Sequence, residues 1–288
     1  MKRALALCLI AAVGYGLAAV LQAQGARHAG AKGRTGLVRT AKQPLFLCGV
    51  VLDVFSWVIS RFALHTLPLF AVQTILAGSL AITVLLARVM LKSELRRTDQ
   101  VAVALTIAGL IIVGISAGED TAHGLTRGLR VGVLLGVPAV ALVGLATIKL
   151  AKPIALSVLA GAAFTGSALA ARTVSVADIS VNGVLTEPLL WAVLLYAVMA
   201  LVFHAVALMQ GTVGAVTSAM WATEVVVATV IGALLLDDHM RPGWQIPAII
   251  GIGMTLVATV ILARSPAQDL EHRALVTHPQ LEVEDLPA

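Results

Sequence analysis

The sequence predicts an all-α, polytopic membrane protein with about nine transmembrane helices. Of its 288 residues, 59% are hydrophobic and only 12% are charged, and the mean hydropathy is +0.97. A soluble domain, in contrast, usually carries about a quarter charged residues. The apolar residues also gather into stretches of roughly 20, which is the length that crosses the hydrocarbon core of a bilayer. Composition and segment length therefore lead to the same fold class.

The expected spans follow one another along the chain with short polar connections. Pro44, Pro153 and Pro188 stand at span starts, where the missing N–H of proline leaves no hydrogen bond unmade. Residues 25–43 form a basic, Gly-rich loop, and residues 263–288 are polar, which predicts a mobile cytoplasmic tail. The expected spans are 4–24, 44–65, 67–91, 100–117, 129–150, 153–174, 188–209, 212–236 and 244–262.

The basic residues between the spans predict the orientation of the chain. If the amino terminus lies outside, thirteen of the 20 Lys and Arg residues fall at inner loops and helix ends, and six fall at outer ones. Cytoplasmic loops are enriched in Lys and Arg. We therefore expect a multi-pass protein of the plasma (inner) membrane, with its amino terminus outside and its carboxyl terminus in the cytoplasm.

The two halves of the chain resemble each other at an offset of 144 residues. Glu94 and Arg97 at one helix end correspond to Asp238 and Arg241 at another. The offset spans five helices, so the two copies would have opposite directions in the membrane. We expect one transmembrane domain over 1–262, with repeat 1 at about 4–117, a linker helix at 129–150 and repeat 2 at about 153–262. Inverted repeats are typical of transporters that open alternately to each side.

Five polar or aromatic residues share one face of the second span: Asp53, Ser56, Trp57, Ser60 and Arg61. A carboxylate in hydrocarbon costs about 3 kcal/mol or more unless it faces a bundle interior or a wet cavity. We expect Asp53 to bind a cation or a proton, with the serines as hydroxyl ligands. We expect Arg61 to extend to the outer surface. The alternative is a buried Asp53 held by serine hydroxyls or by a basic group.

A second acid, Glu224, lies near the centre of the eighth span. Thr217 and Trp221 share its face of the helix, and Glu224 is a candidate proton carrier. The alternative is a neutral glutamic acid that locks helices together through hydrogen bonds. Gln73 and His204 are further candidates for the lining of a solute or ion path.

Two other groups of residues have predicted roles at helix ends or helix contacts. Glu94 and Asp238 are expected to cap or bridge helix ends, in a structural or gating role. Gly128, Gly132 and Gly136 recur every four residues, a spacing that lets helices approach closely. We expect them to pack within the monomer rather than at a dimer contact.

Several of these segments resemble the drug/metabolite transporter (EamA-like) superfamily. Residues 62–68 read Phe-Ala-Leu-His-Thr-Leu-Pro and precede a span that closes with Leu-Lys-Ser-Glu-Leu at 91–95; a helix with Gly109 and Gly114 follows. The nine spans, the basic loop and the acid midway along the second span are most similar to the NIPA-like branch. That resemblance implies transport of Mg²⁺ or another divalent cation. The sequence departs from the pattern at Ser93, where the family has Gly, and at Asp53, where the branch has Glu.

We therefore expect a secondary transporter with alternating access and a central acidic site. Asp53 and Glu224 would be the ligands of a metal ion such as Mg²⁺, or an organic solute would stack on Trp57, Trp221 and Tyr15. Alternatives are a flippase for a lipid-linked sugar and a non-transporting scaffold or accessory subunit. No enzymatic motif is present. No cofactor is expected other than Mg²⁺ or H⁺ as the transported or coupling ion. The expected partners are the lipid bilayer and a small solute or cation, with no nucleic acid; the oligomeric state is left open.

Overall fold

The protein is an all-α bundle in a computed structural model that describes residues 2–28, 42–90, 96–118, 127–150, 152–173, 187–211, 213–236, 238 and 240–265. Within these residues every regular element is a helix, and one antiparallel bridge joins Ala117 to Met240. Nine helical spans of the described chain are long and apolar enough to cross a membrane. The predicted fold class is confirmed, and the predicted span limits differ from the observed ones by only a few residues.

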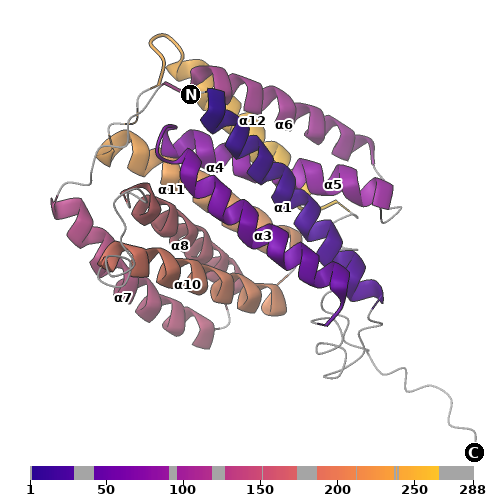
Figure 1. Ribbon diagram of the computed structural model, residues 1–288, viewed down its shortest axis with the longest axis horizontal. Helices are drawn as coiled ribbons and strands as arrows, with labels where there is room; N and C mark the ends of the chain where they lie inside the picture. Colours follow the sequence, from indigo (N-terminus) through magenta and orange to yellow (C-terminus); the bar gives the residue numbers. More distant parts are fainter. Residues whose placement is uncertain are drawn as a thin grey trace, which may run out of the picture.

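Ten helices build these spans, because α4 and α5 together form the third one (Figure 1). Pro44, Pro153 and Pro188 begin α3, α8 and α10, as the sequence predicted. The helices are α1 (Lys2–His28), α3 (Pro44–Ala63), α4 (Leu69–Ala77), α5 (Ser79–Met90), α6 (Arg97–Ser116), α7 (Arg127–Lys149), α8 (Pro153–Thr173), α10 (Pro188–Gln210), α11 (Val213–Leu235) and α12 (Gln245–Leu262).

A glycine interrupts the third span, which the sequence predicted as continuous. Gly78 alone separates α4 from α5, and its N–H still donates to the carbonyls of Thr74 and Ile75. A Cβ atom on Gly78 would lie 2.6 Å from Cδ1 of Leu110 on α6, so the leucine side chain would have to shift. Glycine therefore permits the close approach of α6, and it also weakens the helix at this point.

The packing of the first half of the chain recurs in the second half. The helix α1 packs extensively against α3 and also against α5, and α8 packs in the same way against α10 and α11. The helices α6 and α12 pair with each other across the two halves. The helix α7 packs mainly against α8 and α10, at the edge of the bundle (Figure 1).

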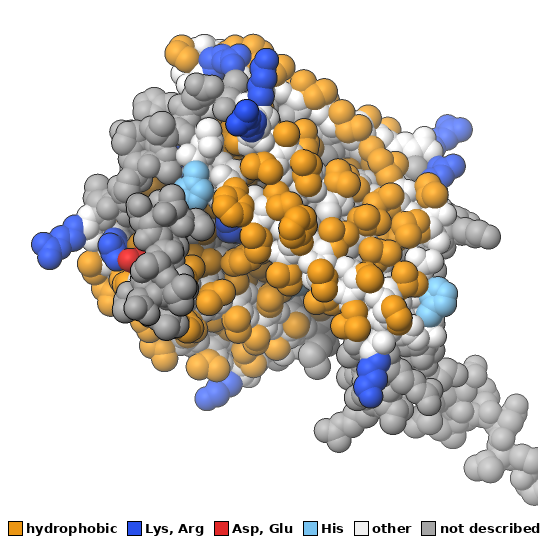
Figure 2. All heavy atoms as spheres, viewed as in Figure 1, with side chains coloured by type: hydrophobic (Ala, Val, Ile, Leu, Met, Phe, Trp, Pro, Cys, Tyr) orange, Lys and Arg blue, Asp and Glu red, His pale blue; other side chains and the backbone are white. Residues whose placement is uncertain are grey.

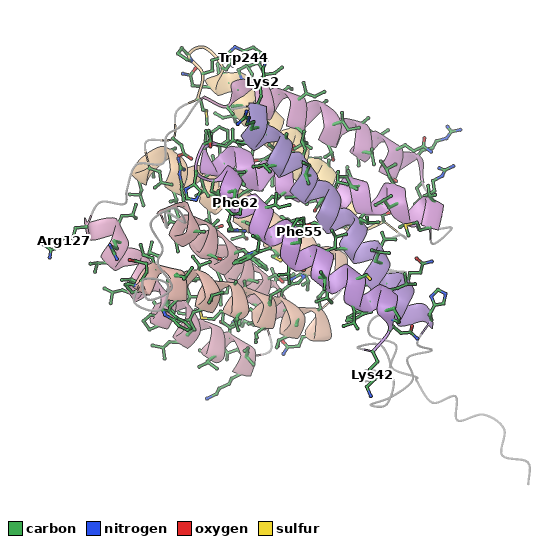
Figure 3. The ribbon with its side chains drawn as sticks, viewed as in Figure 1. Lys2, Lys42, Phe55, Phe62, Arg127 and Trp244 are labelled. Atoms are coloured by element: carbon green, nitrogen blue, oxygen red, sulfur yellow. The ribbon has the colours of Figure 1, made fainter. Side chains whose placement is uncertain are left out.

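The outside of the bundle is apolar. Figure 2 shows hydrophobic side chains spread over the face that α1 and α3 form, with most of the Lys and Arg side chains in view at its margins. On α3, Phe55 and Phe62 point outward and are 59% and 45% exposed (Figure 3). The span Leu69–Met90, in contrast, is 83% buried. This surface suits hydrocarbon, and α4 and α5 form the centre of the bundle.

Figure 3 also shows how the charged ends of the helices are distributed. Lys2 and Trp244 lie together at one end of the bundle, and Lys42 lies at the opposite end. The basic residues therefore mark the two ends of the helices. The direction of the chain across the membrane stays a prediction.

The glycine series on α7 does not pack as expected. A Cβ atom on Gly128 or Gly132 would meet no described atom within 4 Å, so the prediction of packing inside the monomer is wrong for these two. Only Gly136 is covered, by the Tyr196 hydroxyl, which donates a hydrogen bond to the Val133 carbonyl at 2.9 Å. The reason is that α10 approaches α7 around Tyr196. The predicted tail beyond residue 265 lies outside the described residues, as does Glu94.

Candidate functional site

The polar face of α3 is turned toward the inside of the bundle. The buried residues of this helix are Gly49, Ser56, Ser60 and Ala63, which recur along one side of it. Asp53 and Trp57 are half-buried beside them. The opposite side carries exposed aliphatic and aromatic residues, including Val51 at 68%. An amphipathic α3 therefore presents its small and polar residues to its neighbours and its large apolar residues to hydrocarbon.

The two serines of this face make their hydrogen bonds within their own helix. Ser56 Oγ donates to the Leu52 carbonyl and Ser60 Oγ donates to the Trp57 carbonyl, both at 2.7 Å. Such bonds satisfy the hydroxyl protons locally. The serines therefore do not hold Asp53 in place, and the oxygen atoms of their hydroxyl groups retain acceptor capacity. Gly14 of α1 lies directly against Ser56, where any side chain would collide with the hydroxyl.

Arg61 turns into the bundle, which corrects the expectation that it extends to the outer surface. Its guanidinium carbon lies 5.1 Å from the centre of the Trp57 ring, one helical turn earlier on α3. A guanidinium at this distance over an aromatic ring makes a cation–π contact. The Nε and Nη1 atoms are buried and have no hydrogen-bond partner. The Arg61 side chain is also hydrogen-bonded to Tyr15 and lies within electrostatic range of Glu224.

Glu224 reaches the same region from α11. The residue is only 4% exposed. Its backbone is held by α8, because Thr165 Oγ1 donates to the Glu224 carbonyl at 3.1 Å. The two helices touch closely at Gly161, where a Cβ atom would lie 3.0 Å from the Glu224 nitrogen. The backbone of Glu224 is therefore fixed, and its carboxyl group lies within electrostatic range of Tyr15 on α1 and Arg61 on α3.

Tyr15 of α1 connects the two predicted acids. It lies within electrostatic range of Asp53, Arg61 and Glu224, and close to the Ser60 hydroxyl. The structure thus brings charged and polar side chains of α1, α3 and α11 into one group. We call this group the central cluster; its members are Tyr15, Asp53, Trp57, Ser60, Arg61 and Glu224.

Three further predicted residues lie on α11 or on α4, which packs against α1 and α11. Trp221, one turn before Glu224, contacts all four hydrophobic clusters of the described chain and so lies at their junction. Thr217, another turn earlier, is 8% exposed. Gln73 is completely buried on α4, which packs against α1 and α11, and neither atom of its side-chain amide has a hydrogen-bond partner. The candidate residues of the site therefore also include residues of α4 and α11.

His204 stands apart from this group. It lies on α10, which packs mainly against α8 and α7. Its Nδ1 atom is buried without a hydrogen-bond partner. No set of three or more His, Cys, Asp or Glu side chains in the described chain comes close enough together to hold a metal ion. Asp53 and Glu224 thus have no third ligand of these types among the described residues.

A second polar site lies at one end of the bundle. The carboxylate of Asp238 forms an ion pair with Arg172 of α8 at 2.5 Å and accepts the N–H of Leu69 at 2.6 Å. Both charged side chains are almost fully buried, at 1% and 4% exposure. Burial, and to a smaller extent the charge of Arg172, lowers the pKa of His65 beside it. Asp238 therefore joins α8 to the first turn of α4, where a carboxylate also complements the helix dipole.

Sequence reasoning missed the position of two arginines. Arg61 carried a usable signal, since it lies on the same face of α3 as Asp53 and one turn after Trp57. Arg172 carried none, because it lies 66 residues from Asp238 in the sequence. Only the packing of α8 against α11, the helix that precedes Asp238, brings that pair together.

No protein-family model, curated protein or solved structure matches this chain.

Proposed function

We propose that this multi-pass membrane protein is a secondary transporter of the drug/metabolite transporter type. It moves a small polar solute through the central cluster by alternating access, and Glu224 exchanges a proton during the cycle. One observation carries the proposal. Ionisable side chains from three helices gather inside a bundle with an apolar exterior, and the Arg61 guanidinium among them has unfilled hydrogen-bond donors.

The energetics of these buried groups support a role in binding. Leaving a buried donor without a partner costs about 1–3 kcal/mol, and more for a charged group. A polar network that only holds helices together gains most when each member is satisfied. Arg61 and Gln73 are not satisfied. A solute that enters the central cluster would supply the missing partners, whereas a scaffold would gain nothing from keeping them open.

The arrangement of the helices supports alternating access. The contacts of α1 with α3 and α5 recur as those of α8 with α10 and α11, which suits two related halves. Asp238, which is paired with Arg172, also accepts a hydrogen bond from the N–H of Leu69. This contact links the second half to the first half at one end of the bundle. Breaking and re-forming such a link would open and close that end. The halves would be the inverted repeats that the sequence predicts.

The charges of the central cluster favour an organic solute over a bare divalent cation. A hard cation such as Mg²⁺ needs several oxygen ligands. Here a guanidinium lies within electrostatic range of Glu224, and it would repel a cation bound to that carboxylate. Trp57 and Trp221 offer aromatic surface beside the charges. We therefore place Mg²⁺ second to a small metabolite as the transported species, with H⁺ as the coupling ion.

Transport by purified protein in proteoliposomes tests the proposal. The liposomes contain a pH-sensitive dye and are offered a panel of organic solutes and divalent cations. We expect at least one solute to drive proton movement in the parent protein. Glu224→Gln should abolish the proton movement, because glutamine cannot release a proton, and Asp53→Asn should weaken the transport.

Glu187→Gln is the matched control, because Glu187 pairs with Arg130 in an exposed ion pair outside the central cluster. This variant should transport as the parent does. The proposal is wrong if no solute is moved, or if both cluster variants match the parent for every solute that is moved.

A further inference from the structure

Arg61 has two open hydrogen-bond donors beside an aromatic ring. Its guanidinium carbon lies over the Trp57 ring, 5.1 Å from the ring centre, so a ligand does not reach Arg61 from the side of that ring. The Nε and Nη1 atoms are buried and have no partner there. A guanidinium offers its N–H groups in a planar fork that matches the two oxygen atoms of a carboxylate. The free part of Arg61 is therefore complementary to a planar oxyanion.

The acids near Arg61 do not fill these donors. Glu224 lies within electrostatic range of the guanidinium, but it is not hydrogen-bonded to Nε or Nη1. Glu224 is held from behind by α8, through the Thr165 hydrogen bond and the close contact at Gly161. Tyr15 contacts the Arg61 side chain, but Nε and Nη1 still have no partner. A buried arginine keeps such donors open only at a cost in stability.

Gln73 is a second buried side chain whose hydrogen-bonding groups have no partner. Its side chain is fully buried on α4, and both Oε1 and Nε2 lack a partner. The helix α4 packs against α1, which carries Tyr15, and against α11, which carries Glu224. An amide can donate to a carboxylate and can also accept from an N–H or O–H group. Arg61 on α3 and Gln73 on α4 are thus two unsatisfied side chains on helices that both pack against α1, and together they indicate a ligand site better than either one does.

We infer that the solute bound in the central cluster is a small organic acid whose carboxylate is held by Arg61. This inference rests on the proposed function and names its substrate class. The amide of Gln73 bonds to a second polar group of the solute. The apolar part of the solute lies against Trp221, at the junction of the four hydrophobic clusters. Glu224 lies within electrostatic range of the same guanidinium.

Binding to the full-length protein in detergent tests this inference without a transport assay. The probes are acetate, benzoate, phenylacetate and indole-3-acetate, each compared with its neutral primary amide, and MgCl₂. Binding is measured by calorimetry and by the rise in thermal stability. We expect at least one carboxylate to bind roughly 10- to 100-fold more tightly than its amide, which is the range for hydrogen bonds to a charged group.

Variants of Arg61 test whether this residue binds the carboxylate of the ligand. Arg61→Gln should lower the affinity for the carboxylate to that for the amide. Arg61→Lys keeps the charge but loses the planar fork, and it should also weaken binding even if the glutamine variant does not fold. Arg130→Gln is the matched control, because it removes an arginine from an exposed ion pair, and it should bind as the parent does.

The outcomes separate this inference from the proposed function. The inference is overturned if no carboxylate binds, if the amides bind equally well, if only MgCl₂ binds, or if the Arg61 variants keep the parent affinity. Transport of a neutral or cationic solute that depends on Glu224 would overturn the inference and leave the transporter standing. Carboxylate binding at Arg61 with no transport of that acid or any other solute would support the site and refute the transporter.

Discussion

At the scale of single residues, the central cluster keeps polar groups unsatisfied where apolar ones would stabilise the fold. Gln73 is fully buried with neither end of its amide bonded, and Arg61 has two buried nitrogen atoms without partners. The neighbouring Thr74 is equally buried but satisfied, because its hydroxyl donates to the Phe70 carbonyl at 2.7 Å. Native proteins keep few unsatisfied groups, and these gather at functional sites.

Gln73→Leu should therefore make the protein more stable and less active. Leucine has a similar volume and removes two unsatisfied polar atoms, so we expect a gain of about 1–3 kcal/mol in the free energy of unfolding. Solute affinity should fall, since the amide no longer contacts the ligand. Thermal unfolding in detergent, together with the binding assay, measures both effects.

Thr74→Val is the control for this change. It also replaces a buried polar side chain on α4, but one whose hydrogen bond is already made, so it should bring no gain in stability. A loss of stability in Gln73→Leu would show that the amide has a structural partner and would contradict its assignment as a ligand group.

At the scale of elements, small residues decide where helices touch. Gly109 of α6 faces Gly251 of α12, and a Cβ atom on Gly109 would lie 2.6 Å from Thr255 Oγ1 and 2.7 Å from the Gly251 carbonyl oxygen. At the 144-residue offset between the two halves, Gly109 corresponds to Gly253, which lies two residues after Gly251 on α12. Gly253 meets no described atom within 4 Å of a Cβ position. The glycine of α12 that packs against Gly109 is therefore Gly251, and the correspondence between the repeats does not identify it.

Alanine at these two positions should have opposite effects. Gly109→Ala forces α6 and α12 apart and should cost about 1–3 kcal/mol, the usual range for overpacking. Gly253→Ala adds a methyl group in open space and should stabilise the helix by up to about 1 kcal/mol. Thermal unfolding of both variants in the same detergent tests the contact. Equal effects would show that the two helices are not closely packed at Gly109.

At the scale of the whole molecule, the Arg172–Asp238 ion pair closes one end of the bundle. It joins α8 to the segment between α11 and α12, and Asp238 also bonds to the first N–H of α4. Removing one partner of a buried pair usually costs about 3–5 kcal/mol, because the other charge is left behind. In the alternating-access mechanism, the same change favours the state that is open at this end.

Asp238→Asn should make this end more accessible. The test uses a variant without the native cysteines, Cys8→Ser with Cys48→Ser, and a reporter cysteine from His65→Cys beside the ion pair. A membrane-impermeant maleimide should label the reporter faster after Asp238→Asn, and the thermal stability should fall. Glu187→Gln, which removes an exposed pair, should leave the labelling rate unchanged. Unchanged labelling after Asp238→Asn would contradict the closing role.

Much of the fold could be predicted because its physical signals are local. Span length and composition indicated the nine spans, and Pro44, Pro153 and Pro188 indicated three helix starts. The inward direction of the α3 face followed from the spacing of Ser56 and Ser60. The break at Gly78 and the exposed glycines of α7 were not predictable, because they depend on how closely another helix approaches.

Some features of the candidate site could likewise be predicted from the sequence, and others could not. Asp53 and Glu224 stand out in the sequence, since a carboxylate in an apolar stretch is costly and therefore rare. The inward turn of Arg61 and its open donors, and the pairing of Arg172 with Asp238, were decided by tertiary packing alone. Periodicity along one helix specifies which side chains share a face. The partner of a long, flexible arginine, however, is set by charges on other helices, which only the folded bundle brings within reach.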